Sequence, residues 1–281
     1  MGTSPGRLVL LGHPVSHSLS PAMHNAAFKA LGLPHTYSTR DVVPEKLAGV
    51  VASLRGETAL GANVTIPHKE NALRLVDEVV EEARRIGAIN TIIRRGSRLV
   101  GENTDKYGFL CAVKDARSSP DEHDFRIGTS LVLGAGGAAR ACILALLENG
   151  NDVLVASRDR SRAEDVARAM TPFAAAQRRV SVVDLPRPGA ALGVVCVVNA
   201  TPLGMHGEDP LEGVDLPDVV VDLVPIAEET PLVSRARRSQ HVDFVVDGLL
   251  MLLHQAARSF ELWTGASAPL EAMRAALPRR A

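Results

Sequence analysis

The sequence predicts a chain of two α/β domains. Its length of 281 residues suits two ordinary domains, and 46% of the residues are apolar, which is enough to fill two cores. Short β-rich runs alternate with longer helical patterns along the whole chain. Strands that alternate with helices in this way form a mostly parallel sheet with helices on its faces.

The first domain opens with a strand at residues 7–11 and a helix. Ser20 is the expected N-cap of this helix, Pro21 its first residue, and Gly32 ends it. The other elements expected in this domain are strands at 35–42, 62–66 and 91–94 and helices from residue 44 and over 77–86.

Residues 117–124, RSSPDEHD, have the composition of a linker, and a second unit begins after them. A strand at 131–133 runs into GAGGAA, and a helix follows that ends at Asn149 with Gly150 as its C-cap. We expect a first domain over 1–108, a second over 109–247, and C-terminal helices over 248–281 that return to the first domain. Further strands are expected at 152–156, 180–183, 194–198 and 219–222, and helices at 162–170, 248–263 and 269–277.

Charge and hydropathy exclude several classes of partner. The 31 basic and 32 acidic residues give a net charge of −1, so neither nucleic acid nor an anionic membrane is an expected partner. No apolar run approaches the ~20 residues of a membrane helix, and the N-terminus lacks the pattern of a signal peptide. Cys111, Cys142 and Cys196 stand in apolar contexts and are expected to be buried free thiols of a cytoplasmic protein, a monomer or a homodimer.

GAGGAA, residues 134–139, predicts a dinucleotide site and a Rossmann-like second domain. The motif follows an apolar strand and opens a helix within a unit of about 30 residues, the context that this fingerprint requires. Gly134 permits the tight turn, Gly136 lets the backbone approach a pyrophosphate, and Ala139 lets the helix pack on the strand. The alternative is a glycine-rich turn that binds nothing.

The end of the next strand indicates which dinucleotide is bound. Ser157 stands where NAD enzymes usually carry an acidic residue, and Arg158, Arg160 and Arg162 follow. Guanidinium groups suit a 2′-phosphate, so the pattern favours NADP over NAD. Asp159 could instead bind the ribose of NAD, or it could cap the next helix in a solvated run of charges.

Polar motifs in the first domain stand at expected strand ends. GHPVSHSLSP places Ser16 and Ser18 in a loop before a helix, where hydroxyl groups can bind a carboxylate. ANVTIPHK contributes Thr65 and Lys69, GAINT contributes Asn90, and GENTDKYG contributes Asp105. A surface lysine and a helix cap are the plain structural alternatives for Lys69 and Asp105. The nine histidines form no metal motif, and no metal is expected.

Two further motifs are NATPLGM (199–205) and DGLLMLLHQAARSFELWTG (247–265). All these motifs, in the order in which they occur, resemble the shikimate dehydrogenase family. The resemblance implies two α/β domains with the active site in the cleft between them. It also implies NADP-dependent reduction of 3-dehydroshikimate to shikimate, a step of chorismate and aromatic amino-acid biosynthesis.

The resemblance implies a role for each matching residue. Lys69 and Asp105 match the catalytic acid/base pair. The substrate-binding positions are Ser16, Ser18, Thr65, Asn90, Asp105 and Gln255. The cofactor-binding positions are Gly134, Ala135, Gly136, Gly137, Ala138, Ser157, Arg158, Arg162, Leu223, Gly248 and Glu81.

The chain departs from the family pattern at three places. Ser157-Arg158-Asp159 replaces the usual Asn-Arg-Thr or Asn-Arg-Asp, Pro225 replaces a substrate-contacting tyrosine, and Leu250 replaces a small residue. Three other functions remain as alternatives: a quinate/shikimate dehydrogenase that uses NAD, a Rossmann-fold methyltransferase, and a nucleotide-binding regulator without catalysis.

Overall fold

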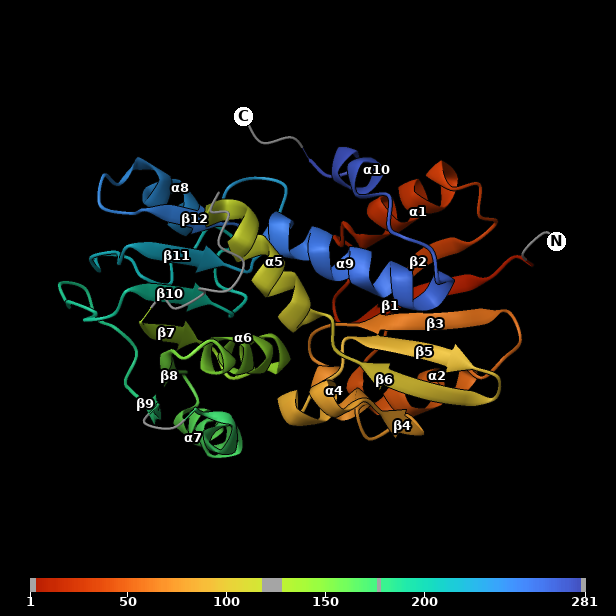
Figure 1. Cartoon of the computed structure of the whole chain (residues 1–281), viewed down its shortest axis with the longest axis horizontal. Helices are drawn as coiled ribbons and strands as arrows, with labels where there is room; N and C mark the ends of the chain where they lie inside the picture. The colour runs from red at the N-terminus through yellow and green to blue at the C-terminus, as the bar shows by residue number, and fades with distance from the viewer. Residues whose placement is uncertain (1–3, 118–127, 176–177, 279–281) are drawn as a thin grey trace. The chain divides into compact units, whose positions relative to one another are not determined.

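The fold comes from a computed structural model, which describes residues 4–117, 128–175 and 178–278 (Figure 1). These residues form two compact units. Unit 1 contains the residues up to Gly108 and those from Leu252 onward, and unit 2 contains Phe109 to Met251. The chain passes from one unit to the other within helix α5 (Asp105–Arg117) and again within helix α9 (Gly248–Thr264). Each unit has a six-stranded sheet, which confirms the prediction of two α/β domains.

The sheet of unit 1 has the strand order β2-β1-β3-β5-β6-β4. Strand β1 pairs in parallel with β2 and β3, whereas β5 runs antiparallel to both β3 and β6. A tight hairpin accounts for the antiparallel pairing of β5 with β6, because only Gly96 and Ser97 join the two strands and Gly96 adopts a φ of 63°. The strands are β1 (Arg7–Gly12), β2 (Thr36–Asp41), β3 (Ala59–Val64), β4 (Glu78–Val79), β5 (Thr91–Arg95) and β6 (Arg98–Glu102).

The helices of unit 1 correct two expectations. Ser20 is the first residue of α1 and Leu19 is its N-cap, so Ser20 does not cap the helix. The segment 77–86 is only partly helical, because the backbone N–H of Asp77 and its side chain both bond to Leu99 and draw β4 alongside β6. The helices are α1 (Ser20–Ala30), α2 (Leu47–Ser53) after a 3₁₀ turn (Pro44–Lys46), α3 (Lys69–Ala72), α4 (Glu81–Ile86) and α10 (Leu270–Ala275).

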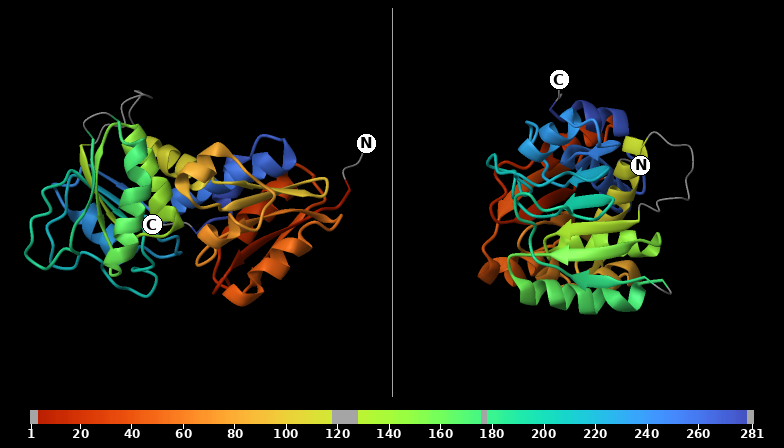
Figure 2. Two further views of the ribbon diagram at one scale, coloured as in Figure 1. Left: turned by 90° about the horizontal axis from the view of Figure 1, so that it is seen from below. Right: turned by 90° about the vertical axis from the view of Figure 1, so that its left-hand side faces the viewer.

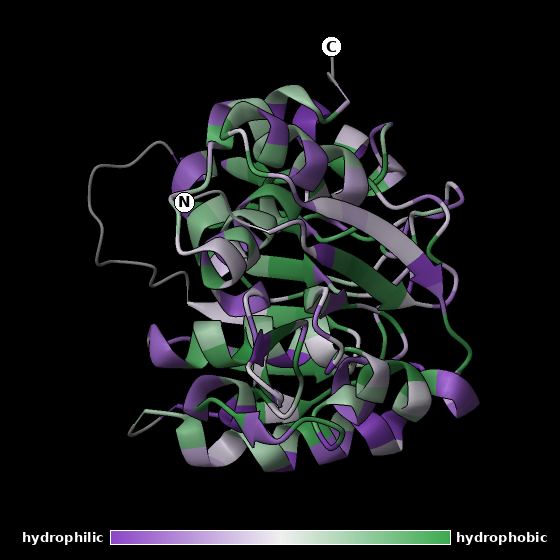
Figure 3. Ribbon diagram, turned by 90° about the vertical axis from the view of Figure 1, so that its right-hand side faces the viewer, coloured by the Kyte–Doolittle hydropathy of each residue, from purple (hydrophilic) through white to green (hydrophobic). Residues whose placement is uncertain are grey.

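Apolar side chains fill both faces of this sheet. Alternate residues of β1 point to opposite faces, so Leu10 packs in the cluster that contains Phe28 of α1 and Phe260 of α9. Leu11 packs on the other face in the cluster that contains Val51 of α2. Figure 3 shows this distribution, with hydrophobic strands inside and hydrophilic residues on the outer sides of helices. Helices therefore cover both faces of the sheet of unit 1.

Unit 2 has an entirely parallel sheet with the order β12-β11-β10-β7-β8-β9 (Figure 2). Numbered from its first strand, this is the 3-2-1-4-5-6 order of a dinucleotide-binding Rossmann fold. Helix α8 and strand β12 were not expected from the sequence. The elements are β7 (Thr129–Leu133), α6 (Gly137–Glu148), β8 (Asp152–Ala156), α7 (Arg160–Met170), a 3₁₀ turn (Thr171–Phe173), β9 (Val180–Val182), β10 (Cys196–Asn199), β11 (Val219–Asp222), α8 (Pro231–Arg238) and β12 (Phe244–Val246).

The three cysteines are free thiols. Cys142 and Cys196 are buried as expected, whereas Cys111 is half-buried. None of the described helices combines the length and apolarity of a membrane span. Most of the expected linker, residues 118–124, lies outside the described residues.

His24 is a titratable group in the apolar core of unit 1. It is fully buried on α1, and its ring stacks on Tyr37 with 4.3 Å between the ring centroids. Burial lowers the pKa of His24 to about 3, because the imidazolium form would lose its hydration. The folded state therefore holds His24 neutral at pH values where an unfolded histidine takes up a proton.

This difference predicts a loss of stability in acid. Since the folded pKa is depressed, the unfolded state binds more protons below pH ~6.5, and the free energy of unfolding falls from there towards pH 3. The His24 contribution amounts to about 2 kcal/mol at pH 5. His24→Phe should flatten the pH dependence of urea unfolding between pH 7 and 5 by this amount. The same change at exposed His241 is the control, and equal slopes for both variants would contradict the assignment.

Candidate functional site

A buried ion pair lies where two helices of unit 1 begin. Lys69 is the first residue of α3 and Asp105 is the first residue of α5. Lys69 Nζ donates to Asp105 Oδ2 over 2.5 Å, and the two side chains are only 13% and 5% exposed. A charged pair so shielded from water loses much stability if one partner is removed, because the other charge is then buried alone. The pairing rules out the surface-lysine alternative for Lys69.

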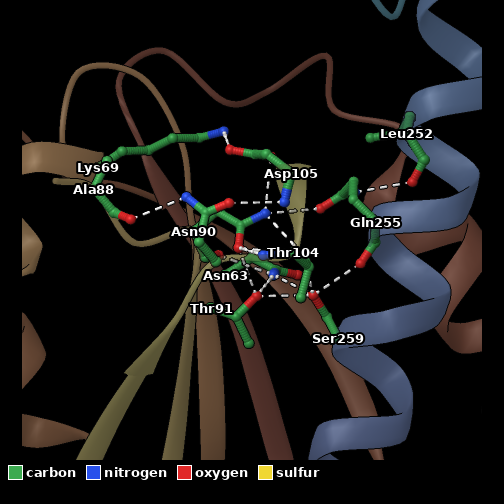
Figure 4. Close-up of polar contacts among 11 residues, drawn as sticks. Asn63, Lys69, Ala88, Asn90, Thr91, Thr104, Asp105, Leu252, Gln255 and Ser259 are labelled. Carbon is green, nitrogen blue, oxygen red and sulfur yellow. Dashed lines mark hydrogen bonds and ion pairs between the residues drawn. The ribbon is translucent and has the colours of Figure 1, made fainter. Parts of the chain in front are cut away.

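Asn90 holds the other oxygen of Asp105. This asparagine directly precedes β5, and its Nδ2 donates to Asp105 Oδ1 over 2.9 Å (Figure 4). The same nitrogen lies 3.2 Å from Oε1 of Gln255 on α9. The side chain of Asn103 accepts from the backbone N–H of Asp105, so Asn103 caps the start of α5. Both carboxylate oxygens of Asp105 thus bond to side chains, and the carboxylate is not the cap.

Thr65 and the two loop serines lie near the carboxyl ends of neighbouring strands. Strands β1 and β3 are parallel, so the loops that follow them leave the same edge of the sheet. The backbone N–H of His13 donates to Ile66 O, and a Cβ at Gly12 would lie 2.4 Å from the Thr65 methyl group. The loop with Ser16 and Ser18 therefore begins against the loop that carries Thr65.

Ser16 is exposed and Ser18 is half-buried. The Ser18 hydroxyl accepts the backbone N–H of Ser20 over 3.2 Å. Since a hydroxyl has one proton and two lone pairs, this contact leaves the Ser18 proton available for an acceptor such as a carboxylate.

Unit 2 contains an open cavity at the start of its first two helices. The cavity has a volume of about 420 Å³ and is lined by Ala135, Gly136, Ser157, Arg158, Asp159 and Arg162. Gly136 is the N-cap of the 12-residue helix α6, and a Cβ added to it would meet no atom within 4 Å. Open space against a helix N-terminus is what the pyrophosphate of a dinucleotide requires. The residues present therefore fit such a cofactor.

The charged residues after β8 have different roles. Asp159 is the N-cap of α7, and its Oδ1 accepts the backbone N–H of Arg162 over 3.1 Å. Arg160 pairs with Glu164 and Asp184 and does not line the cavity. Arg158 is exposed, lines the cavity, and forms no ion pair among the described residues. The cap alternative for Asp159 therefore holds, and Arg158 lines the cavity with no ion-pair partner among the described residues.

The other expected cofactor residues do not line this cavity. A Cβ on Gly248 would lie 2.8 Å from the carbonyl carbon of Leu223, so these two residues of unit 2 are packed backbone to backbone. Gly134 turns the chain after β7 with a φ of 111°, and Gly137 and Ala138 are the first residues of α6. Glu81 begins α4 in unit 1, where its exposed side chain pairs with Arg84.

A buried carboxylate shapes the loop between β11 and α8. Asp222 accepts from Thr230 Oγ1 over 2.6 Å and from Asn199 Nδ2 over 2.9 Å. Burial raises the pKa of Asp222, and these hydrogen bonds oppose that shift. The contacts close the loop that contains Pro225, the position at which the family usually has tyrosine.

Sequence reasoning missed a set of buried polar groups beneath Asn90. Asn63, Thr91, Thr104 and Ser259 are at most 5% exposed and hydrogen-bond to one another and to Asn90 (Figure 4). Asn63 and Thr91 could have been found from the sequence, because each is a polar residue in an otherwise apolar strand. Ser259 gave less indication, because a small residue on the apolar face of a helix is common. Among the described residues no cluster of histidine, cysteine or carboxylate groups could hold a metal ion.

Known proteins match this chain over nearly its whole length. The family model described as the shikimate dehydrogenase substrate binding domain matches residues 10–92, and that of the shikimate 5′-dehydrogenase C-terminal domain matches 248–277. A protein of Symbiobacterium thermophilum named shikimate dehydrogenase (NADP(+)) is 45% identical, with 97% of this chain and 94% of the relative covered. The chain belongs to the shikimate dehydrogenase family.

Solved structures of the shikimate dehydrogenase family agree in fold. Shikimate 5-dehydrogenase of Thermus thermophilus, in complex with NADP(H) and shikimate, has a TM-score of 0.80 and 37% identity over 96% of this chain and 98% of its own. Quinate dehydrogenase of Corynebacterium glutamicum, in complex with NAD, has a TM-score of 0.81 and 29% identity over 97% of this chain and 99% of its own. The fold is thus shared by relatives with different substrates and cofactors.

Proposed function

We propose that this chain catalyses the reversible NADP-dependent reduction of 3-dehydroshikimate to shikimate. The observation that carries the proposal is the Lys69–Asp105 pair, buried and held on its far side by Asn90. Curated relatives of this chain are named shikimate dehydrogenase (NADP(+)), among them one of Methanopyrus kandleri that is 42% identical over 95% of this chain and 93% of its own length. Unit 1 would hold the substrate and unit 2 the cofactor.

The residues of unit 1 supply the proton chemistry of this reaction. NADPH, when bound, supplies a hydride to the carbonyl carbon of 3-dehydroshikimate. Lys69 Nζ, as an ammonium group, would stabilise the developing alkoxide and transfer a proton to its oxygen. Asp105 would keep the ammonium in place, and Asn90 would keep Asp105 in place. In the reverse direction neutral Lys69 accepts the proton of the shikimate hydroxyl.

The hydroxyl and amide groups around this pair would orient the substrate. Ser16 and Ser18 would bind its carboxylate through their hydroxyl protons. The Ser18 proton is available for this, because the bond from the Ser20 backbone N–H uses only a lone pair of the Ser18 hydroxyl. Thr65, Asn90 and Gln255 would bind its ring hydroxyls. No cation is needed near the carboxylate, since hydrogen bonds to a charged acceptor are strong.

The residues of unit 2 would hold NADP. Gly134 to Ala138 would surround the pyrophosphate at the start of α6, and Ser157, Arg158 and Arg162 would surround the adenosine 2′-phosphate. Leu223 and Gly248 would lie beside the nicotinamide, and Glu81 would approach the cofactor from α4. The capping role of Asp159 supports NADP over NAD, because the carboxylate is already bonded to the backbone of α7.

We also propose that the protein works in the cytoplasm, where its three free cysteines would remain reduced. Small molecules are its expected partners.

The decisive assay follows the absorbance of reduced nicotinamide with shikimate and with quinate, each tested with NADP and with NAD. Turnover should be fastest with shikimate and NADP. Faster turnover of quinate with NAD would show instead that this chain is a quinate dehydrogenase, like its relative. No turnover of any pair would favour a non-catalytic nucleotide-binding protein.

Lys69→Met should lower kcat by about 10²–10⁴, the usual loss for a positioned acid/base group. Methionine keeps the length of the side chain but cannot donate a proton or balance Asp105. Affinity for NADPH, measured by fluorescence titration, should stay unchanged. Lys46→Met at an exposed position is the control. A Lys69 variant with native kcat at every pH would remove this residue from the mechanism.

Arg158→Leu should lower kcat/KM for NADP by about tenfold or more, since one charge-assisted hydrogen bond contributes ~1.5–3 kcal/mol. The value for NAD should hardly change, because NAD has no 2′-phosphate. Arg160→Leu is the matched control, as Arg160 pairs with carboxylates outside the cavity. Equal losses for both cofactors in the Arg158 variant would disprove a 2′-phosphate contact.

Replacing both Ser16 and Ser18 by alanine should reduce kcat/KM for shikimate by about a hundredfold or more, because two hydroxyl donors to a charged acceptor are lost. The loss should be much smaller for an analogue in which a neutral amide replaces the carboxylate. Steady-state kinetics with both compounds distinguish this role from a structural one, for which both substrates would lose equally.

A further inference from the structure

Ser259 is a polar residue on the inward face of α9 that no part of the reaction requires directly. Its side chain is completely buried, among the apolar residues that α9 packs against the sheet. Its Oγ lies 2.8 Å from Thr91 Oγ1, 3.1 Å from Thr104 Oγ1 and 3.1 Å from Asn63 Nδ2, and it donates to the backbone carbonyl of Gln255 over 3.0 Å (Figure 4). One hydroxyl therefore contacts groups from two strands, the start of α5 and its own helix.

Two of the residues that Ser259 contacts are direct neighbours in the chain of residues expected to bind the substrate. Thr91 directly follows Asn90 in the chain, and Thr104 directly precedes Asp105. Gln255 lies one helical turn before Ser259, and its side-chain oxygen is bonded to Asn90. Ser259 thus joins the turn of α9 that carries Gln255 to the neighbours of both Asn90 and Asp105.

We infer that Ser259 is a positioning residue, whose hydroxyl fixes the helical turn that carries Gln255 relative to Asn90 and Asp105 and so orients the substrate. This inference rests on the proposed function, because Gln255, Asn90 and Asp105 are the groups expected to hold 3-dehydroshikimate.

The hydrogen bonds of the neighbouring groups separate this role from a purely structural one. Without the Ser259 hydroxyl, the protons of Thr91 and Thr104 can still bond to Asn90 Oδ1, at 3.0 and 3.2 Å. Asn63 Nδ2 can still bond to the backbone carbonyl of Asn90 and to Thr91 Oγ1. Ser259→Ala therefore leaves no buried donor unsatisfied, and its main consequence is that α9 loses its polar contacts to these residues.

A second residue of the same helix provides a matched control. Thr264 Oγ1 donates to the backbone carbonyl four residues earlier, that of Phe260, over 2.8 Å. Ser259 makes the same kind of bond within α9, but Thr264 has no hydrogen bond to Asn90, Thr91 or Thr104. Thr264→Ala removes this helical bond and the bond that Thr264 Oγ1 accepts from the backbone N–H of Ala266, and neither involves the site. Any common effect of the two changes therefore belongs to the helix and not to the site.

The experiment measures 3-dehydroshikimate reduction by the full-length wild type, Ser259→Ala, Thr264→Ala, Gln255→Ala and the double variant Ser259→Ala/Gln255→Ala. Ser259→Ala should lower kcat/KM for 3-dehydroshikimate by about two- to tenfold, the effect of one neutral hydrogen bond, with KM for NADPH unchanged. Thr264→Ala should leave kcat/KM at the wild-type value. Because Ser259 acts through Gln255, adding Ser259→Ala to Gln255→Ala should cause no further loss.

Several results would overturn the inference. Equal kcat/KM for Ser259→Ala and Thr264→Ala would show that the hydroxyl does not affect the site. Additive losses in the double variant would show that Ser259 does not act through Gln255. If Ser259→Ala fails to fold, Ser259→Cys keeps the side-chain size with a weaker hydrogen bond, and wild-type kcat/KM in that variant would also overturn it. A wild-type protein without turnover would refute the proposed function itself, a result distinct from the others.

Discussion

The Lys69–Asp105 ion pair is the constraint on which the architecture of unit 1 depends. Two opposite charges 2.5 Å apart and almost hidden from water are stable only if each keeps its partner. The fold satisfies this by starting one helix at each residue, so that both side chains leave rigid backbone. Asn103 bonds the backbone at the start of α5, which leaves the carboxylate of Asp105 to the lysine and to Asn90.

The polar groups beneath this pair are also buried, so each of them needs a hydrogen-bond partner within the core. Tyr37 donates to Asn63 over 2.8 Å, and Asn63 donates to the backbone carbonyl of Asn90, so the network reaches from a buried aromatic cluster to the candidate site. A buried polar network is stabilising only when each member has a partner, and this one meets that condition. Such a network restricts the positions that its members can take, which favours precise orientation of a substrate.

Much of this arrangement could be predicted from the sequence, and the exceptions have physical reasons. The strand–glycine–helix pattern at Gly134 predicted the Rossmann-like unit, since local spacing alone specifies that turn. The antiparallel β5 was missed because it depends on a hairpin of only two residues, Gly96 and Ser97. Strand β4 was missed because its pairing depends on Asp77 bonding to a residue 22 positions away. Ser259 could not be assigned, since the side chains that it contacts lie more than 150 residues earlier in the chain.

The two candidate sites depend on different parts of the polypeptide. In unit 2, the cavity is lined by the turn at Gly136 and by the residues after β8, and it is the side chains after β8 that would distinguish one cofactor from another. In unit 1, side chains from β3, β5, α3, α5 and α9 form the site, and almost every polar atom bonds to another residue of the group. Substitutions in unit 2 can therefore change cofactor preference one contact at a time. A substitution in unit 1 changes the position of several groups together, so effects of neighbouring changes there should be strongly non-additive.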